Sequence, residues 1–180
     1  MTVRGADAEL RIDAAIGQVV RLAHLPGDRR ALADLVALGP AALRRAVEIW
    51  YHVPGAEQTE ALTDAQASRH PREIIDAWAW LFAELARAYP DAYVQEIAAG
   101  RLTIPRDHAT MEMAVLGLLE NAGAAAVLRA HAGHPNWLVR LQVVRGLARR
   151  TDPDSRSTLA TFLEDEQQMI RSEAATALAG

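Results

Sequence analysis

The sequence predicts an all-α protein, an α-solenoid built from about five antiparallel helix pairs. Residues 134–149 align with residues 165–180, which lie 31 positions later, and this alignment places Val139-Arg140 on Ile170-Arg171. A fixed period of this length is typical of stacked helical repeats. Proline, whose ring suits the first turn of a helix, also stands near the expected start of five helices, at positions 40, 71, 105, 135 and 153.

The composition favours helices and excludes several kinds of chemistry. Hydrophobic residues make up 51% of the chain, and valine and isoleucine never alternate with polar residues over the length of a strand. The chain has no cysteine, which excludes disulfides, thiolate metal sites and nucleophilic cysteines. All 19 basic residues are arginine, which excludes lysine Schiff bases and the lysine of a P-loop.

Charge and hydropathy predict a cytoplasmic protein that does not associate with membranes. The formal net charge of −4 provides no overall attraction to nucleic acid or to anionic lipid. Residues 1–10 contain no apolar signal segment, and no apolar run approaches the ~18 residues of a membrane span.

Residues 1–51 are predicted to form diverged N-terminal helices. We expect helices over residues 7–25, 28–38 and 40–51, separated by Pro26-Gly27 and Gly39-Pro40, which interrupt a helix. The first helix has an apolar stripe made of Ile12, Ile16, Val19 and Ala23. The inward residues of the third are Leu43, Ala46, Val47 and Trp50.

Residues 52–70 are polar and only weakly periodic, so we expect a connector there, either a thin surface helix or a loop. Pro71 then opens the most strongly amphipathic helix, which extends to Tyr89. Its apolar ridge consists of Ile74, Trp78, Leu81 and Leu85, with Phe82 beside it.

The remaining helices are expected over residues 91–101, 108–120, 121–133, 134–150, 153–164 and 166–179. The segment 108–120 is apolar on nearly every side, which predicts a central, buried helix. We expect one domain over residues 1–180, in which residues 71–180 carry the best-matching repeats.

The pattern Asp-x-x-x-x-Val/Ile-Arg-x-x-Ala-x-x-x-Leu, on short paired helices, resembles HEAT repeats over about residues 107–179. The 31-residue period is closer to the short bacterial HEAT-like form than to the longer repeats. The resemblance implies a superhelical stack in which the Val/Ile packs inward and the second helix of each pair lines a concave surface. It also implies that other macromolecules are held on that surface.

The same resemblance implies a ladder of arginine–aspartate contacts between neighbouring turns. Asp165 and Arg171 fit the ladder positions, and Arg140 fits as well, whereas His134 occupies the position of the aspartate in the repeat of Arg140. We expect Arg140 to be partly buried between turns and bonded to carbonyl groups or to the carboxylate of Asp165 or Asp107.

No arrangement of residues predicts catalysis, a metal or a cofactor. His131-x-x-His134 spans a glycine and lacks a third ligand nearby, so solvated turn histidines explain it better than a metal site. Asp107-His108 is explained by a helix start, and no serine lies in a Gly-x-Ser-x-Gly elbow. We therefore expect a protein that is not an enzyme.

A local basic patch is the first candidate binding surface. Residues 121–151 contain no acidic residue but five arginines. Gln142, Arg145 and Arg149 fall on one helix face, opposite the apolar stripe of that helix, and Arg145 is expected to lie in solvent until a partner binds. A solvated helix face is the alternative. With Glu173 on the last helix, these residues are the predicted partner-binding set in this half of the chain.

Trp80 is the second candidate. It lies in a polar row with Asp76, Glu84 and Arg87, away from the apolar ridge, so it is either an exposed interface anchor or a side chain covered by a neighbouring helix. In addition, incomplete cover of the C-terminal helix at Ala175, Leu178 and Ala179 would favour self-association.

These observations predict a non-enzymatic scaffold or adaptor that binds another protein. The expected partner has an acidic surface. The resemblance also extends to bacterial immunity and regulatory proteins. The alternative class is nucleic-acid binding or repair, because HEAT-like alkylpurine DNA glycosylases share the architecture. Those are strongly basic, whereas this chain is acidic and has no lysine.

Overall fold

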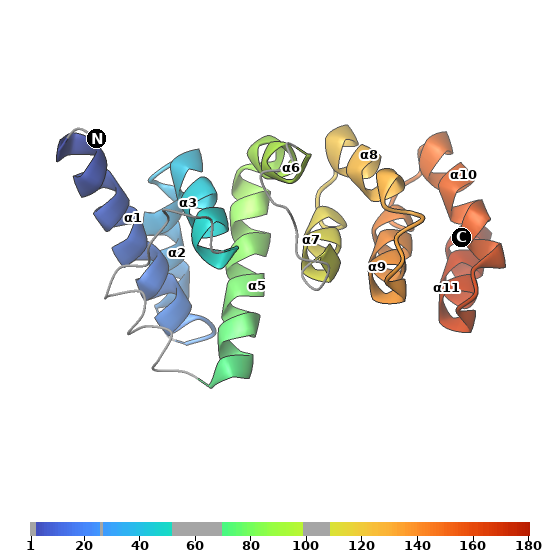
Figure 1. Cartoon of the computed structure of the whole chain (residues 1–180), viewed down its shortest axis with the longest axis horizontal. Coiled ribbons are helices and arrows are strands. Elements are labelled where there is room, and N and C mark those ends of the chain that lie inside the picture. The colour runs from blue at the N-terminus through green and yellow to red at the C-terminus, as the bar shows by residue number, and fades with distance from the viewer. Residues whose placement is uncertain (1–2, 26, 52–69, 99–108) are drawn as a thin grey trace. The chain divides into compact units, whose positions relative to one another are not determined.

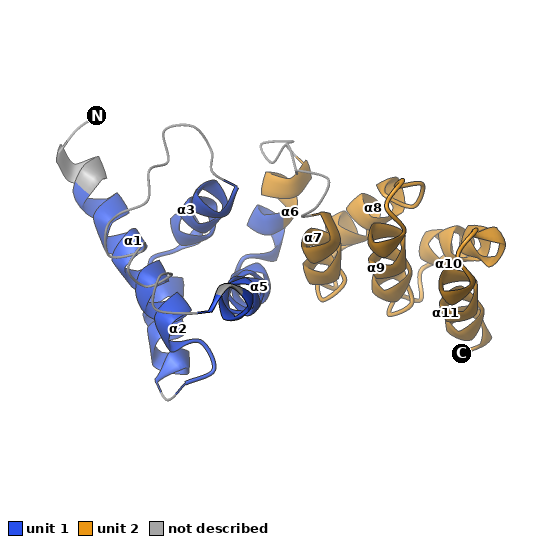
Figure 2. Ribbon diagram, turned by 60° about the horizontal axis from the view of Figure 1, so that its bottom comes forward, with its two compact units in different colours: residues 1–93 blue, residues 94–180 orange. Residues whose placement is uncertain are grey.

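The computed structural model of the chain describes residues 3–25, 27–51, 70–98 and 109–180, which form helices and turns without a strand. This confirms the all-α class that the sequence predicts. The chain divides into two compact units, Met1–Tyr93 and Val94–Gly180 (Figure 2). The expected connector, apart from His70, and Asp107 lie outside the described residues.

Unit 1 is built around its first helix (Figure 1). Its helices are α1 (Val3–Leu22), α2 (Asp28–Val36), α3 (Pro40–Trp50), α5 (Pro71–Ala88) and the beginning of α6 (Pro90–Ala98), which continues into unit 2. Helix α1 packs against α2, α3 and α5. Residues from these helices form one apolar core, which includes Ile16, Leu35, Leu43 and Leu81.

The turns of unit 1 follow from local sequence. Gly27 and Gly39 adopt φ angles of 93° and 84°, which glycine tolerates far better than other residues. Both stand immediately before a helix, at the two breaks that the sequence predicts. Helix α5 begins with a capping box, in which the His70 side chain accepts a hydrogen bond from the Arg72 amide and Glu73 accepts one from the His70 amide.

Three aromatic rings from α3 and α5 pack together in unit 1. The ring centroids of Trp50 and Trp78 are 5.2 Å apart, and those of Trp78 and Phe82 are 5.7 Å apart. Trp78 and Phe82 are buried, as the apolar ridge of residues 71–89 predicts. Aromatic pairs in this range stabilise a core beyond the area that they bury.

An ion pair also crosses this core. The Asp13 side chain on α1 is fully buried and accepts two hydrogen bonds from Arg45 on α3, at 2.8 Å from Nε and 2.9 Å from Nη2. Glu48 lies 3.7 Å from the same guanidinium. Hydrogen bonding to Asp13 raises the pKa of Arg45 above its ordinary value. The sequence analysis did not identify this pair, although Asp13 stands three residues before Ile16 and therefore shares its inward face.

Unit 2 consists of two rows of helices, as a solenoid predicts. Helix α9 (Trp137–Leu147) packs against α7 (Ala109–Leu116) before it and α11 (Gln168–Ala179) after it. The other row contains α8 (Ala122–Ala130) and α10 (Pro153–Thr161), which the short 3₁₀ helix η1 (Phe162–Glu164) follows. Each row therefore contains one helix from each successive repeat.

The 31-residue period of the sequence is also the period of the helix starts. Asn121 caps α8 by accepting a hydrogen bond from the Ala124 amide, and Asp152 caps α10 by accepting one from the Ser155 amide. The two caps are 31 positions apart, and so are the first residues of the two helices. Each repeat is therefore started by the same local device.

Helices α7 and α9 approach each other closely at two glycines. A Cβ atom added to Gly117 would lie 3.0 Å from the Cα atom of Gly146, and one added to Gly146 would lie 3.0 Å from the Cα atom of Gly117. No backbone can shift cheaply to relieve such a contact. The glycines therefore set the spacing between these repeats.

Glu112 is a fully buried acid in the interior of unit 2. Its side chain is fully buried on α7, and neither carboxylate oxygen has a hydrogen-bond partner. Burial raises its pKa from 4.5 to about 8. Most residues of α7 are buried, as the apolar pattern of residues 108–120 predicts, but that pattern did not indicate a buried acid. The repeat period aligns Glu112 with Val143 and Ala174, which are both buried.

The helix boundaries differ from the predicted ones by a few residues, and local hydrogen bonds accompany two of these differences. Residues 134–136 form a turn before α9 because the Asn136 side chain accepts a hydrogen bond from the Leu138 amide. Helix α11 begins two residues later than expected, after a turn in which the Asp165 carboxylate accepts a hydrogen bond from the Gln167 amide. Apolar periodicity alone does not reveal such caps.

Candidate functional site

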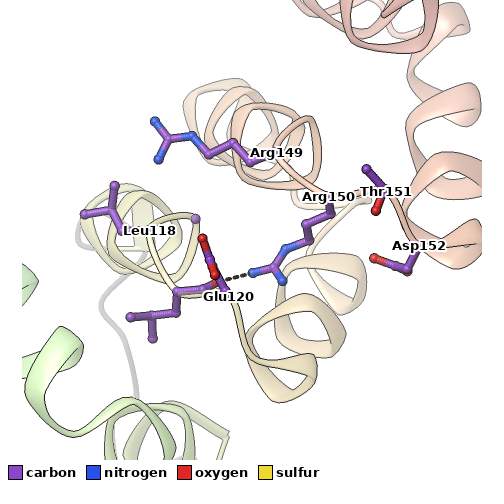
Figure 3. Close-up of a pocket in the computed structure, with 8 residues that line it drawn as sticks. Leu118, Glu120, Arg149, Arg150, Thr151 and Asp152 are labelled. Atoms are coloured by element: carbon purple, nitrogen blue, oxygen red, sulfur yellow. Dashed lines mark hydrogen bonds between the residues drawn. The ribbon is translucent and has the colours of Figure 1, made fainter.

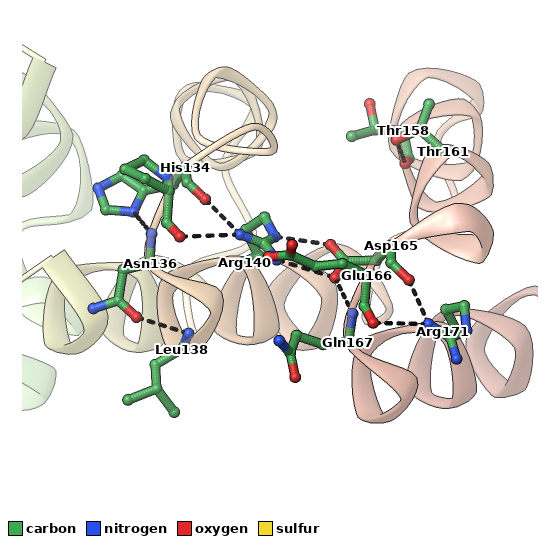
Figure 4. A network of polar contacts seen from close by, with 11 residues as sticks. His134, Asn136, Leu138, Arg140, Thr158, Thr161, Asp165, Glu166, Gln167 and Arg171 are labelled. Atoms are coloured by element: carbon green, nitrogen blue, oxygen red, sulfur yellow. Dashed lines mark hydrogen bonds and ion pairs between the residues drawn. The ribbon is translucent and has the colours of Figure 1, made fainter.

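Arg140 connects two consecutive repeats of unit 2 (Figure 4). Its Nη1 donates to the carbonyl oxygens of His134 and Pro135, at 2.9 and 3.2 Å. Its Nε and Nη2 donate to the two carboxylate oxygens of Asp165, at 2.8 and 3.1 Å, and Nη2 also reaches Glu166 at 2.9 Å. The Arg140 side chain is 9% exposed. The guanidinium therefore stabilises the turn before α9 and links it to the turn before α11.

Hydrogen bonding in this network also shifts the pKa values of both partners. The hydrogen bond from Arg140 lowers the pKa of Asp165, and the bond to Asp165 raises the pKa of Arg140. Both groups are therefore held in their charged forms, which is what a paired and hydrogen-bonded ion pair requires inside a protein.

Arg171 repeats half of this arrangement one period later. Its Nη1 donates to the carbonyl oxygens of Asp165 and Glu166, at 2.6 and 3.0 Å. These carbonyls are the 31-residue counterparts of those at His134 and Pro135. The structure thus brings together all three residues that the sequence assigns to the ladder, Arg140, Asp165 and Arg171.

The histidine at the aspartate position of the earlier repeat has a physical explanation. The residue that would correspond to Arg140 one period earlier is Ala109, which offers no guanidinium to a carboxylate. The His134 ring keeps the local task, because its Nδ1 accepts a hydrogen bond from the Asn136 amide at 3.1 Å, just as Asp165 accepts one from the Gln167 amide. The turn is therefore preserved although a histidine stands in place of the aspartate.

We expect Arg140→Ala to lower the free energy of unfolding by ~1–3 kcal/mol, because it leaves a nearly buried carboxylate and two carbonyls without their donor. Arg145→Ala on the same helix is the matched control. It should cost at most ~1 kcal/mol, since the ion pair between Arg145 and Glu173 is exposed. Urea denaturation followed by circular dichroism measures both. Equal losses for the two variants would contradict the structural role of Arg140.

The predicted partner-binding residues of the basic patch lie on or beside α9. Arg145 donates to Glu173 on α11, at 2.7 Å from Nη2 and 3.1 Å from Nε. Arg145 is exposed, as expected, with 47% of its side chain accessible, but it also has an ion-pair partner that the sequence did not indicate. Sequence spacing did not reveal the pair because the two residues are 28 positions apart on different helices. Gln142 is partly exposed and Arg149 is exposed.

Arg149 also lines a cleft of about 330 Å³ between two equivalent turns (Figure 3). The lining residues are Gly117, Leu118, Leu119 and Glu120 from the turn after α7, and Arg149, Arg150, Thr151 and Asp152 from the turn after α9. Arg150 crosses between the turns and donates to the carbonyl oxygens of Leu119 and Asn121. Arg150 is one of the five arginines of the basic patch, and the sequence did not indicate this bridging role.

Trp80 lies in unit 1, is partly buried, and contacts His24 from the turn after α1 and Arg29 from the start of α2. The centroid of its ring is 5.5 Å from that of His24, and the Arg29 guanidinium lies over it at 5.7 Å. Arg29 is also 3.5 Å from Glu84, which pairs with Arg87 at 2.6 Å. The polar row that the sequence predicts is thus a small network beside a half-covered ring, and the role of Trp80 as an interface anchor stays a prediction.

Other chemistry finds little support in the described parts of the chain. The rings of His131 and His134 stack with their centroids 6.3 Å apart, and the Nδ1 atom of each ring bonds a main-chain group. Across residues 3–25, 27–51, 70–98 and 109–180, no three histidine, aspartate or glutamate side chains gather as metal ligands would. In the same ranges, no helix combines the length and hydropathy that a membrane crossing requires.

Comparison with known proteins identifies one similarity. A family model described as HEAT repeats matches residues 80–179, which is more than half of the chain. No curated protein and no solved structure matches the sequence.

Proposed function

This chain belongs to the HEAT repeat family, and we propose that it is a non-enzymatic scaffold or adaptor that binds another protein. HEAT repeats generally mediate protein–protein interactions. The stacked turns of unit 2 support this role, because each repeat adds exposed side chains to a surface whose spacing is fixed by buried contacts.

The observation that carries the proposal is the basic surface around α9. Arg145 and Arg149 are exposed there, and residues 121–151 contribute no carboxylate. Glu173 satisfies part of this charge, since it pairs with Arg145. An acidic side chain of a partner can replace Glu173 beside Arg145 at little cost, because an exposed ion pair contributes only ~0.2–1 kcal/mol to stability. We infer that the partner is an acidic protein that contacts Gln142, Arg145, Arg149 and Glu173.

The narrower roles follow from the family alone. A HEAT-repeat chain is suited to an adaptor, an immunity protein or a regulator, and we propose that it acts in the cytoplasm of a bacterium. Binding of nucleic acid is the competing function. The exposed arginine at position 149 is compatible with it, whereas the net charge of −4 opposes it.

Reversing the charge of both arginines should weaken binding of an acidic protein partner by about tenfold or more, chiefly by slowing association. The test uses the chain immobilised as bait, a lysate of the source cells, and the variant Arg145→Glu/Arg149→Glu. The partner recovered by the wild-type chain is then titrated against both proteins by biolayer interferometry.

The matched control is Arg11→Glu/Arg30→Glu, which makes the same charge change on exposed residues of α1 and α2. It should bind as the wild-type chain does. Equal loss in both variants would show that only net charge matters and would contradict a defined surface. A duplex DNA shift that is retained at physiological salt would instead support the competing function.

A further inference from the structure

An apolar row of side chains on α7 accompanies the basic row of α9. The row on α9 and the turn after it consists of Leu138, Gln142, Arg145 and Arg149, at helical spacings of three and four residues. The 31-residue period maps the last three of these onto α7 and the turn after it, at Met111, Ala114 and Leu118. All of these side chains are exposed or partly exposed. Together the two rows form what we call the α7–α9 surface.

The burial pattern shows that the two rows are in the same register. Every buried residue of α7 has a buried counterpart 31 positions later in α9. The two helices also pack directly against each other. At one end of the rows, Leu118 and Arg149 line the same cleft of about 330 Å³, and Figure 3 shows both side chains on the same flank of it. The apolar row and the basic row therefore lie side by side.

The neighbouring helices differ in charge on this face. The α7 row is apolar throughout, whereas the α9 row carries Arg145 and Arg149. The carboxylate that pairs with Arg145 belongs to Glu173 on α11, which lies beyond α9. Leu138 is 40% exposed although α9 packs against helices on both sides. The α7–α9 surface thus combines exposed apolar side chains with positive charge and contains no carboxylate of its own.

We propose that the α7–α9 surface docks an amphipathic helix of the partner protein, with an apolar face and an acidic flank. This refinement rests on the proposed function, since Arg145 and Arg149 belong to its partner-binding set. The apolar face of such a helix covers Met111, Leu118 and Leu138, and its carboxylates face the two arginines. A nucleic acid would pair with the arginines but leave the apolar row exposed.

The dimensions of packed helices fit this occupant. Two packed helices have axes ~8–10 Å apart, and a helix with its side chains is ~10–12 Å wide. One helix laid along α7 and α9 therefore contacts both rows at once. Arg145 and Arg149 are four residues apart on the chain, so two carboxylates with the same spacing on the docked helix can reach them together.

The test uses two synthetic peptides labelled with fluorescein and the full chain. The first peptide has about 16 residues, or about four helical turns, with leucines along one face and glutamates along its flank. The second has the same composition in an order that forms neither an apolar face nor an acidic flank. Fluorescence anisotropy should show that the amphipathic peptide binds about tenfold more tightly than the reordered one, because only the first matches both rows.

Substitutions in both rows should weaken binding of the amphipathic peptide. Leu118→Gln and Leu138→Gln should each weaken it about tenfold, because a polar amide of similar size replaces an apolar contact. The Leu138 side chain is already 40% exposed, so its variant tests the surface even if Leu118→Gln disturbs the fold. Leu163→Gln is the matched control, since Leu163 is 43% exposed in η1 and lies outside the α7–α9 surface. It should bind the peptide as the wild-type chain does.

Three results would overturn the proposal. One is equal binding of the two peptides, weakened for both by Arg145→Glu/Arg149→Glu, because the surface would then bind charge alone. Another is no binding of the amphipathic peptide to the wild-type chain. The third is a dimer of the free chain in sedimentation velocity that Leu138→Gln dissociates, because a second copy would then be the occupant.

Failure of the proposed function itself appears in a different measurement. The protein partner would then bind the Arg145→Glu/Arg149→Glu variant as tightly as it binds the wild-type chain. If that variant loses the protein partner while Leu118→Gln and Leu138→Gln both retain it, the basic surface stands and the docked amphipathic helix is excluded.

Discussion

Asp13→Ala should lower the free energy of unfolding by ~3–5 kcal/mol, the largest loss expected from a single polar substitution in unit 1. The reason is that Arg45 would keep its charge in a largely buried position after losing the two hydrogen bonds to Asp13. Glu48 is 3.7 Å away and partly exposed, so it cannot replace them. Tryptophan fluorescence during urea denaturation is a suitable measurement, because three of the four tryptophans lie in unit 1.

Asp34→Ala is the matched control, since Asp34 is an exposed aspartate of the same unit, and it should change stability by no more than ~0.5 kcal/mol. The double variant Asp13→Leu/Arg45→Met should recover most of the loss, because apolar side chains of similar volume can replace a buried pair. A double variant as unstable as Asp13→Ala would show that the loss comes from packing and not from the unpaired charge.

Glu112 should make the protein progressively less stable as the pH rises from about 4.5 to about 8. The pKa of this carboxyl is 4.5 ordinarily and about 8 in the folded chain, so the folded state holds its proton more tightly. A group of this kind contributes its full stability below its unfolded pKa and loses it as the pH rises through the folded pKa. The total change is roughly 3–5 kcal/mol.

Glu112→Gln isolates this effect, because the amide has nearly the same shape and does not titrate. The stability of wild type relative to this variant should fall between pH 4.5 and pH 8, as measured by urea denaturation at several pH values. Glu112→Leu should in addition be more stable than wild type at pH 8, since it removes a buried polar group that has no partner. A difference between wild type and Glu112→Gln that does not change with pH would contradict the raised pKa.

The repeat period made most of unit 2 predictable. It aligned Val139 with Ile170 and Arg140 with Arg171, and both pairs occupy equivalent places in the structure. The same period would have identified Glu112 as a buried acid, because it aligns with two buried apolar residues. This inference needed a comparison of the third repeat and not only of the last two.

Pairs that join different helices were less accessible. Arg145 and Glu173, and Asp13 and Arg45, are far apart in sequence, and each depends on the rotation of two helices about their axes. Apolar periodicity gives that rotation only to within about one residue, which is enough to separate core from surface but not to pair side chains. The partial burial of Trp80 was not predictable for the same reason, because it also depends on how neighbouring helices are rotated.

The Asp165 carboxylate performs two tasks at once, and this has a consequence for cooperativity. It starts α11 by accepting the Gln167 amide, and it joins α11 to α9 by accepting Arg140. If the first turn of α11 unfolds, the contact between Asp165 and Arg140 on α9 is lost as well. If the two repeats separate, Asp165 loses Arg140 and the turn before α11 loses its support. Local helix formation and long-range assembly are thereby coupled through a single side chain, so partially ordered forms with only one of the two are disfavoured.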